Sequence, residues 1–113
     1  MKFKVVTLLI FLMASLNSIS QSPQKHAGKG WKYIDKKEYS EAKKEFQLSL
    51  AKDTLPGNLS GMSYALQGLN DLVEAKKYLL LLTEKFPRHR FTKVQIDLWN
   101  KTYPDNVINF KAD

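Results

Sequence analysis

The sequence predicts an all-α protein, built as a short array of helical hairpins. The first observation is that the tetrad E-A-K-K at residues 41–44 recurs at 74–77. The second is that apolar residues around both copies fall at helical spacing, and the third is that prolines separate the two units. The displacement that maps position 41 onto position 74 is called the repeat shift. A recurrence of this period is typical of helical repeats, in which each unit buries its apolar face on the next.

Residues 1–20 have the features of a secretory signal peptide. Residues 1–4 form a short basic start, and an apolar run follows from Val5 to Leu16. Ser18 and Ser20 place small residues where a signal peptidase would cut before Gln21. The alternative is a retained membrane anchor, although a spanning helix needs about 20 apolar residues and this run is shorter. We therefore predict removal of residues 1–20, which leaves no membrane span.

Composition limits the compartment and the partners. The chain has no cysteine, so lipid attachment after a signal peptide is excluded and packing alone must hold the exported domain together. Removing residues 1–20 takes away two lysines and no acids, which leaves 16 Lys+Arg against 11 Asp+Glu, a formal net charge of +5. This charge favours acidic partners or anionic surfaces. For a periplasmic or secreted protein we expect no nucleic-acid partner.

The folded domain is predicted to span residues 21–103, with its first unit at about 23–55. Ser22 and Pro23 are typical of a helix start, because a hydroxyl caps the free N–H groups and proline fits the first turn. This first helix is expected to end near Lys36 in a polar turn. The second helix of the unit has a buried stripe at helical spacing, formed by Tyr39, Ala42, Phe46 and Leu50.

The second unit is predicted at about residues 56–88. Its first helix is expected from Asn58 to about Leu69, after a proline that stops the preceding helix. A glycine-containing turn follows at residues 68–70. The second helix again has a buried stripe, formed by Leu72, Ala75, Leu79 and Leu82.

A capping helix is predicted at about residues 90–102, ended by Pro104, and a tail at 104–113 follows it. Its apolar residues cover an arc of roughly 200°, wider than the stripe of about 100° that one packing partner needs. This candidate end interface consists of Phe91, Val94, Ile96, Leu98, Trp99 and Tyr103. Either the tail residues Val107, Ile108 and Phe110 fold back over it, or a second copy or another protein covers it. Because such arrays usually need about three repeats, a homodimer through this helix is also expected.

The two units share small residues at two positions, a large apolar residue at a third, and a proline near the end of the second. These are Gly30 with Ser63, Ala42 with Ala75, Phe46 with Leu79, and Pro87. Over residues 23–87 the pattern resembles the tetratricopeptide repeat (TPR) family, although the chain departs from it at Lys29 and Ser49. The resemblance implies a right-handed array of helix pairs that cross closely at the small residues. The alternative is an ordinary bundle of four or five helices.

In the TPR family the inner surface is lined mainly by first helices. The corresponding positions here are Trp31, Ile34, Tyr64, Gln67, Asp97 and Asn100. Two aromatic residues in one groove suit an extended peptide or a partner helix, because rigid rings bury much area at low entropic cost. The other interpretation places Trp31 and Tyr64 in the core between helices. The family's grip on a C-terminal carboxylate is not predicted, since this chain has Ala27 and Trp31 at the positions that need lysine and asparagine.

One face of the first helix carries only lysines. This basic stripe consists of Lys25, Lys29, Lys32 and Lys36. The repeat shift maps it onto largely apolar positions of the second unit, where the helix must pack on the one before it. The first helix has none before it, so the stripe is predicted to be the polar end of the array. The alternative is docking to an acidic partner or an anionic lipid.

The sequence offers little for catalysis. His26 and His89 are far apart in the chain and lie beside basic residues, so we expect both on the solvated surface. No glycine-rich phosphate loop, nucleophile elbow or His-Glu-x-x-His pattern occurs. We expect no catalytic residue, metal or cofactor. The predicted function is an exported, non-catalytic protein-protein interaction module that binds an unidentified protein or peptide through its groove or its unfinished end. The alternative is a small basic adaptor that binds anionic surfaces or acidic partners.

Overall fold

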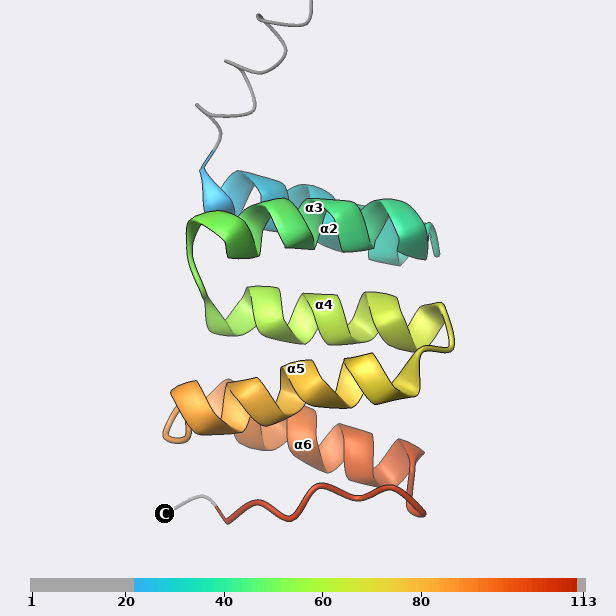
Figure 1. Cartoon of the computed structure of the whole chain (residues 1–113), viewed down its shortest axis with the longest axis vertical. Coiled ribbons are helices and arrows are strands. Elements are labelled where there is room, and N and C mark those ends of the chain that lie inside the picture. The colour runs from blue at the N-terminus through green and yellow to red at the C-terminus, as the bar shows by residue number, and fades with distance from the viewer. Residues whose placement is uncertain (1–21, 112–113) are drawn as a thin grey trace, which may run out of the picture.

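The computed structural model describes residues 22–111, which form five α-helices and no strand and thereby confirm the all-α prediction (Figure 1). The helices are α2 (Pro23–Asp35), α3 (Tyr39–Lys52), α4 (Pro56–Gly68), α5 (Leu72–Lys85) and α6 (Arg90–Thr102). The expected signal peptide at residues 1–20 lies outside the described residues. From residue 22 to 111, no helix is both long and apolar enough to cross a membrane.

The helices lie across the long axis of the molecule, with α2 and α3 together at one end, α4 and then α5 next along the axis, and α6 with the tail at the far end (Figure 1). Each helix packs on the next, and contacts also join α2 to α4 and α4 to α6. Helix α4 therefore has neighbours on several sides, and eight of its 13 residues are buried. Its sequence suits this place because it carries one aromatic residue, no charge and several small side chains.

The helices begin where capping chemistry permits. At α2 the Ser22 Oγ accepts a hydrogen bond of 3.2 Å from the Lys25 N–H, as the sequence predicts. Helix α4 begins at Pro56 rather than at the predicted Asn58. The physical reason is that a proline at the first helical position lacks only an N–H group that would have had no partner within the helix. Pro56 thus starts the second unit.

The two hairpin turns have the same geometry, at positions related by the repeat shift. Lys37 and Asn70 occupy the left-handed region, with φ of 60° and 61°. In the first turn the Glu38 N–H donates to the Tyr33 carbonyl at 2.8 Å. In the second turn the Asp71 N–H donates to the Leu66 carbonyl, also at 2.8 Å. Both turns are therefore Schellman motifs, which satisfy carbonyls that the helix end leaves free.

Replacing Lys37 by glycine is expected to raise the free energy of unfolding by about 0.5–1 kcal/mol, because a side chain in the left-handed region is strained and glycine is not. Asn70→Gly should gain only a few tenths of a kcal/mol, since asparagine tolerates this conformation. Lys36→Gly is the control, because its φ of −86° is ordinary and glycine there loses stability. Urea unfolding followed by circular dichroism measures all three, and equal effects at Lys36 and Lys37 would contradict the prediction.

The centre of the core is the fully buried Phe46 ring of α3. It lies between Gly30 of α2 and Gly61 of α4. A Cβ atom on Gly30 would lie 2.7 Å from the ring, and one on Gly61 would lie closer still. The comparison of the two repeat units predicts a close helix crossing at Gly30, whereas the close approach at Gly61 is seen only in the structure. Both glycines let their helices approach the ring.

Ser49 has a structural role on α3, where it ties the start of α2 in place. The side chain is fully buried on α3, and its Oγ donates a hydrogen bond of 2.6 Å to the Pro23 carbonyl at the start of α2. The Pro23 carbonyl lies in the first turn of α2, so this hydrogen bond holds the start of α2 against α3. An alanine here would fill the space but would not tie the two helix ends together.

Candidate protein-binding surfaces

Trp31 and Tyr64, predicted to line a groove, lie together in the structure. Their ring centroids are 5.7 Å apart in an edge-to-face arrangement. Trp31 also contacts the buried Phe46 ring, with centroids 5.4 Å apart. Both rings are half-buried: the Trp31 ring packs on the core, the Tyr64 ring packs on Trp31, and each presents part of its surface to solvent. The core interpretation therefore applies to Trp31, and both rings keep the partly exposed surface that the groove interpretation requires.

The two aromatic rings are held firmly. Edge-to-face contacts of this kind add about 0.5–1.5 kcal/mol beyond the area that the rings bury. Burial also raises the pKa of the Tyr64 hydroxyl above its usual 10.0, so this group is uncharged at physiological pH. The pair offers a rigid, uncharged and partly apolar surface that spans α2 and α4.

The other groove positions have different surroundings. Ile34 is half-buried and packs against the core. Gln67 donates to Ser63 Oγ at 3.1 Å and accepts from the Tyr103 hydroxyl at 3.3 Å. Asp97 is exposed and pairs with Lys93, whereas the Asn100 side chain is bonded to the tail. The structure therefore groups Trp31 with Tyr64 and leaves the two α6 positions apart from them.

The candidate end interface on α6 divides into covered and exposed residues. Ile96 and Trp99 are each only 2% exposed with the tail in place, so they are corrected from exposed interface residues to core residues. Phe91 and Tyr103 are half-buried, and the Tyr103 ring packs on Trp99 with centroids 4.4 Å apart. Val94 and Leu98 stay exposed at 59% and 43%. Of the six residues in the predicted apolar arc, only Val94 and Leu98 are therefore exposed.

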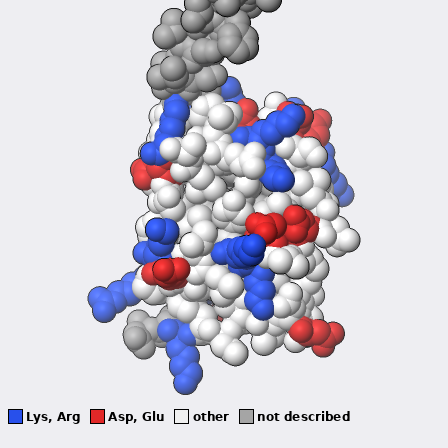
Figure 2. Space-filling view, in the orientation of Figure 1, with Lys and Arg blue, Asp and Glu red and all other residues white. Residues whose placement is uncertain are grey.

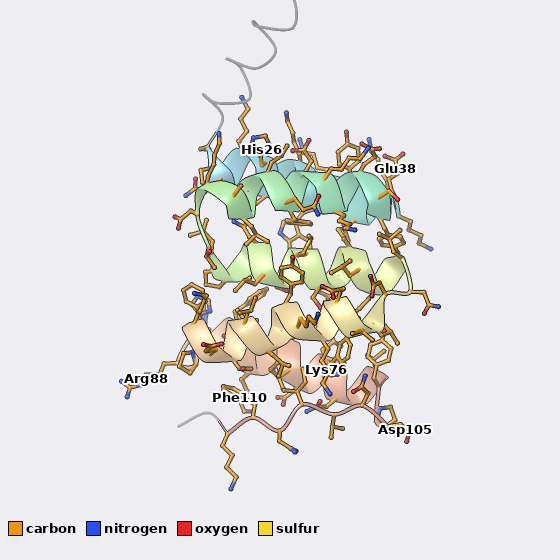
Figure 3. All side chains as sticks on the ribbon, in the orientation of Figure 1. His26, Glu38, Lys76, Arg88, Asp105 and Phe110 are labelled. Carbon is orange, nitrogen blue, oxygen red and sulfur yellow. The ribbon has the colours of Figure 1, made fainter. Side chains whose placement is uncertain are left out.

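The tail covers this end, which was one of the two alternatives left open by the sequence. Ile108 is 4% exposed and belongs to the core, and Phe110 packs against it. Val107, the third tail residue named for this role, is 45% exposed and points away. Figure 3 shows the extended tail running beside the last helices, with Phe110 near its end and Lys76 reaching toward it from α5.

The basic stripe lies on the outer helix of the stack. Lys25, Lys32 and Lys36 are exposed, and Lys29 is half-buried. A depression of about 250 Å³ lies between α2 and α3, and its lining combines three stripe lysines with a phenol and a carboxylate: Lys29, Lys32, Lys36, Tyr33 and Glu45. The Glu45 carboxylate reduces the positive charge of this depression.

The prediction for His26 was wrong. The side chain is buried rather than solvated, and its Nδ1 lies 2.7 Å from the Glu45 carboxylate. Its Nε2 is also buried, without a hydrogen-bond partner. A signal was present in the repeat, because the repeat shift, applied once and then again, maps His26 onto Leu59 and Thr92, which are both buried. His89 is exposed as predicted, and its Nδ1 accepts from the Phe91 N–H at the start of α6.

Acidic and histidine side chains do not cluster in the described part of the chain. No group of three or more histidine, aspartate or glutamate residues between positions 22 and 111 is arranged to hold a metal ion. On the face formed by α3 and α5, basic and acidic side chains are interspersed (Figure 2). Several acids pair with a lysine on the same helix, as Glu74 does with Lys77 at 2.8 Å.

Comparison with known proteins finds no family model, no curated protein and no solved structure that matches the chain.

Proposed function

We propose that residues 21–103 form a short right-handed array of the TPR type, with two helical hairpins and a capping helix. Three features that recur at the repeat shift support this: the sequence tetrad, the left-handed residues Lys37 and Asn70, and the hydrogen bonds of the two turns. The contacts of α4 with both α2 and α6 are those expected where first helices stack along an array. The right-handed sense comes from the resemblance alone.

We further propose that the protein is an exported, non-catalytic interaction module in the periplasm or outside the cell. The observation that carries the binding proposal is the Trp31–Tyr64 pair, in which Trp31 packs on the buried Phe46 ring, Tyr64 packs on Trp31, and both rings stay partly exposed. A partner segment that covers these rings loses little of their conformational freedom, because packing has already immobilised them. An extended peptide or a helix face with apolar side chains fits such a surface.

Tyr64→Ala is expected to weaken capture of the partner at least about tenfold, which is the usual effect of truncating a central aromatic residue. Tyr78→Ala is the matched control, because Tyr78 is also a half-buried tyrosine but lies on α5 beside the depression between α3 and α5. The measurement is quantitative pull-down from a cell-envelope fraction with chain 21–113, after circular dichroism has shown that both variants are folded. Equal partner recovery with the two variants would contradict the groove proposal.

The salt dependence of partner capture distinguishes the groove proposal from the alternative function. The lysine-lined depression on α2 favours a second candidate, a basic adaptor for anionic surfaces or acidic partners. Binding through the Trp31–Tyr64 pair should change little between low and moderate salt. Binding through the lysines should fall steeply as salt rises, since surface charges are screened beyond about 10 Å at 0.1 M.

A further inference from the structure

The tail is bound to α5 and α6 much as a peptide ligand would be bound. The Asn100 side chain donates to the Ile108 carbonyl at 3.0 Å and accepts from the Ile108 N–H at 2.7 Å. The Trp99 indole N–H donates to the Asn106 carbonyl at 2.7 Å. The Lys76 ammonium donates to the Asn106 side chain, also at 2.7 Å (Figure 3). Two helices thus supply three side chains that hold one extended segment.

Three of these four hydrogen bonds involve backbone atoms of the tail. Such bonds form with any residue except a proline at the position of the donating N–H, so they supply affinity with little sequence selection. Selection comes from the side chains that alternate along the extended segment. Ile108 and Phe110 pack inward, whereas Val107 and Asn109 are exposed. The surface therefore selects an aliphatic residue followed, two positions later, by an aromatic one.

The same surface without an occupant would be unfavourable. Departure of the tail would take away the partner of the Trp99 indole N–H and both partners of the Asn100 amide. It would also remove the cover that Ile108 and Phe110 provide. Water would replace the tail as the hydrogen-bond partner of these groups, at a small net cost, and the uncovered apolar area would add a larger one. The end of the array therefore needs an occupant.

The tail is attached in a way that permits exchange. After α6 it makes one turn, in which the Asn106 N–H donates to the Tyr103 carbonyl, and it then runs extended without helix or strand. The helices keep their own backbone hydrogen bonds whether or not the tail is in place. The segment can thus open locally, at a lower cost than global unfolding.

We propose that this end surface, formed by Lys76, Trp99 and Asn100, is a second binding site that takes an extended segment of another protein. The segment carries an aliphatic residue and, two positions later, an aromatic residue, and the chain's own residues 106–110 act as its built-in competitor. The site shares no residue with the Trp31–Tyr64 pair, so it does not rest on the groove proposal. A short tether holds the tail at a millimolar effective concentration, so a partner segment at lower concentration must bind the surface more tightly than the tail does.

The test uses a fluorescent synthetic peptide with the sequence of residues 104–111 as the probe. Full-length Ile108→Asp, whose own tail no longer fits, is expected to bind this peptide at least about tenfold more tightly than the wild-type chain does. A further Asn100→Ala change should then weaken binding about tenfold, because it removes both backbone hydrogen bonds. A peptide with aspartate in place of isoleucine is the control. If folded Ile108→Asp binds the peptide no better than the wild type, the proposal is overturned.

Two measurements on the wild-type chain guard against a variant that does not fold. Hydrogen exchange should show the Ile108 amide exchanging faster than the central α6 amides, and exchange only on global unfolding would overturn the proposal. Light scattering should show a monomer. A dimer that Ile108→Asp abolishes would mean that a second copy's tail fills the site, which also overturns it. Tyr64→Ala, introduced into the Ile108→Asp chain, should leave the peptide affinity unchanged, so failure of the groove proposal remains distinguishable.

Discussion

Replacing Phe46 by alanine is expected to lower the free energy of unfolding by about 3–5 kcal/mol, the usual cost of removing a buried phenylalanine ring. The ring is fully buried and joins three helices, because it fills the space between Gly30 of α2 and Gly61 of α4. Neither glycine has a side chain that can move into the cavity. The site can therefore collapse only if the helices themselves shift, which places the cost in the upper part of the range.

The size of this loss decides whether the domain stays folded. Single domains have a total stability of about 5–15 kcal/mol, so Phe46→Ala should leave a marginal fold. Thermal and urea unfolding followed by circular dichroism are the measurements. Leu48→Ala on the same helix is the control, because Leu48 is 45% exposed and should cost much less. Similar losses for the two variants would contradict the central role of the ring.

Gly61→Ala is expected to lower the free energy of unfolding by about 1–3 kcal/mol, because an added methyl group would overlap the Phe46 ring. This loss should appear although alanine has the higher helix propensity by about 1 kcal/mol. Gly28→Ala is the matched control, since it lies within α2 and a Cβ atom there would meet nothing within 4 Å. That variant should gain stability by about 0.5–1 kcal/mol. The two glycine-to-alanine changes are thus expected to differ in sign.

A double-mutant cycle tests the cause of the difference. In a Phe46→Leu background the ring is absent, so Gly61→Ala should cost at least about 0.5 kcal/mol less than in the wild type. Urea denaturation of the four chains gives the coupling energy. Additive effects would mean that the alanine disturbs something other than the contact with Phe46.

The binding proposals place the two sites at different positions of the stack. The Trp31–Tyr64 pair spans α2 and α4, whereas the tail site belongs to α5 and α6. If both are used, one chain can hold two segments at once. The basic stripe is found on α2, far along the stack from the tail (Figure 1).

The spacing of apolar residues over short stretches of the sequence was sufficient to predict most of the helices. The buried stripes around Ala42 and Ala75 have helical spacing, and those residues are fully buried in the structure. The first helix begins at Pro23 and the last spans Arg90–Thr102, as expected. Such features depend on residues within a few positions of one another, and they recur along the chain.

Contacts between distant residues could not be predicted in this way. The repeat shift indicates burial at His26, but its pairing with Glu45 of another helix exists only because α3 packs over it. Gly61 is required because the ring of Phe46, which belongs to the preceding helix, occupies the space that its side chain would fill. Each depends on how the helices are placed against one another.

The covering of α6 shows most clearly the difference between what the sequence predicts and what the packing of the helices decides. The apolar arc on α6 was visible in the residue order, and it required a cover because uncovered apolar area is unfavourable in water. The residue order allowed the tail, a second copy or another protein to provide that cover. The choice rests on the fit of Ile108 and on the bonds from Trp99 and Asn100, which exist only once the helices are packed. A helical period depends only on nearby residues. Which segment covers the apolar face of α6 depends instead on how well each candidate segment fits that face in the folded protein.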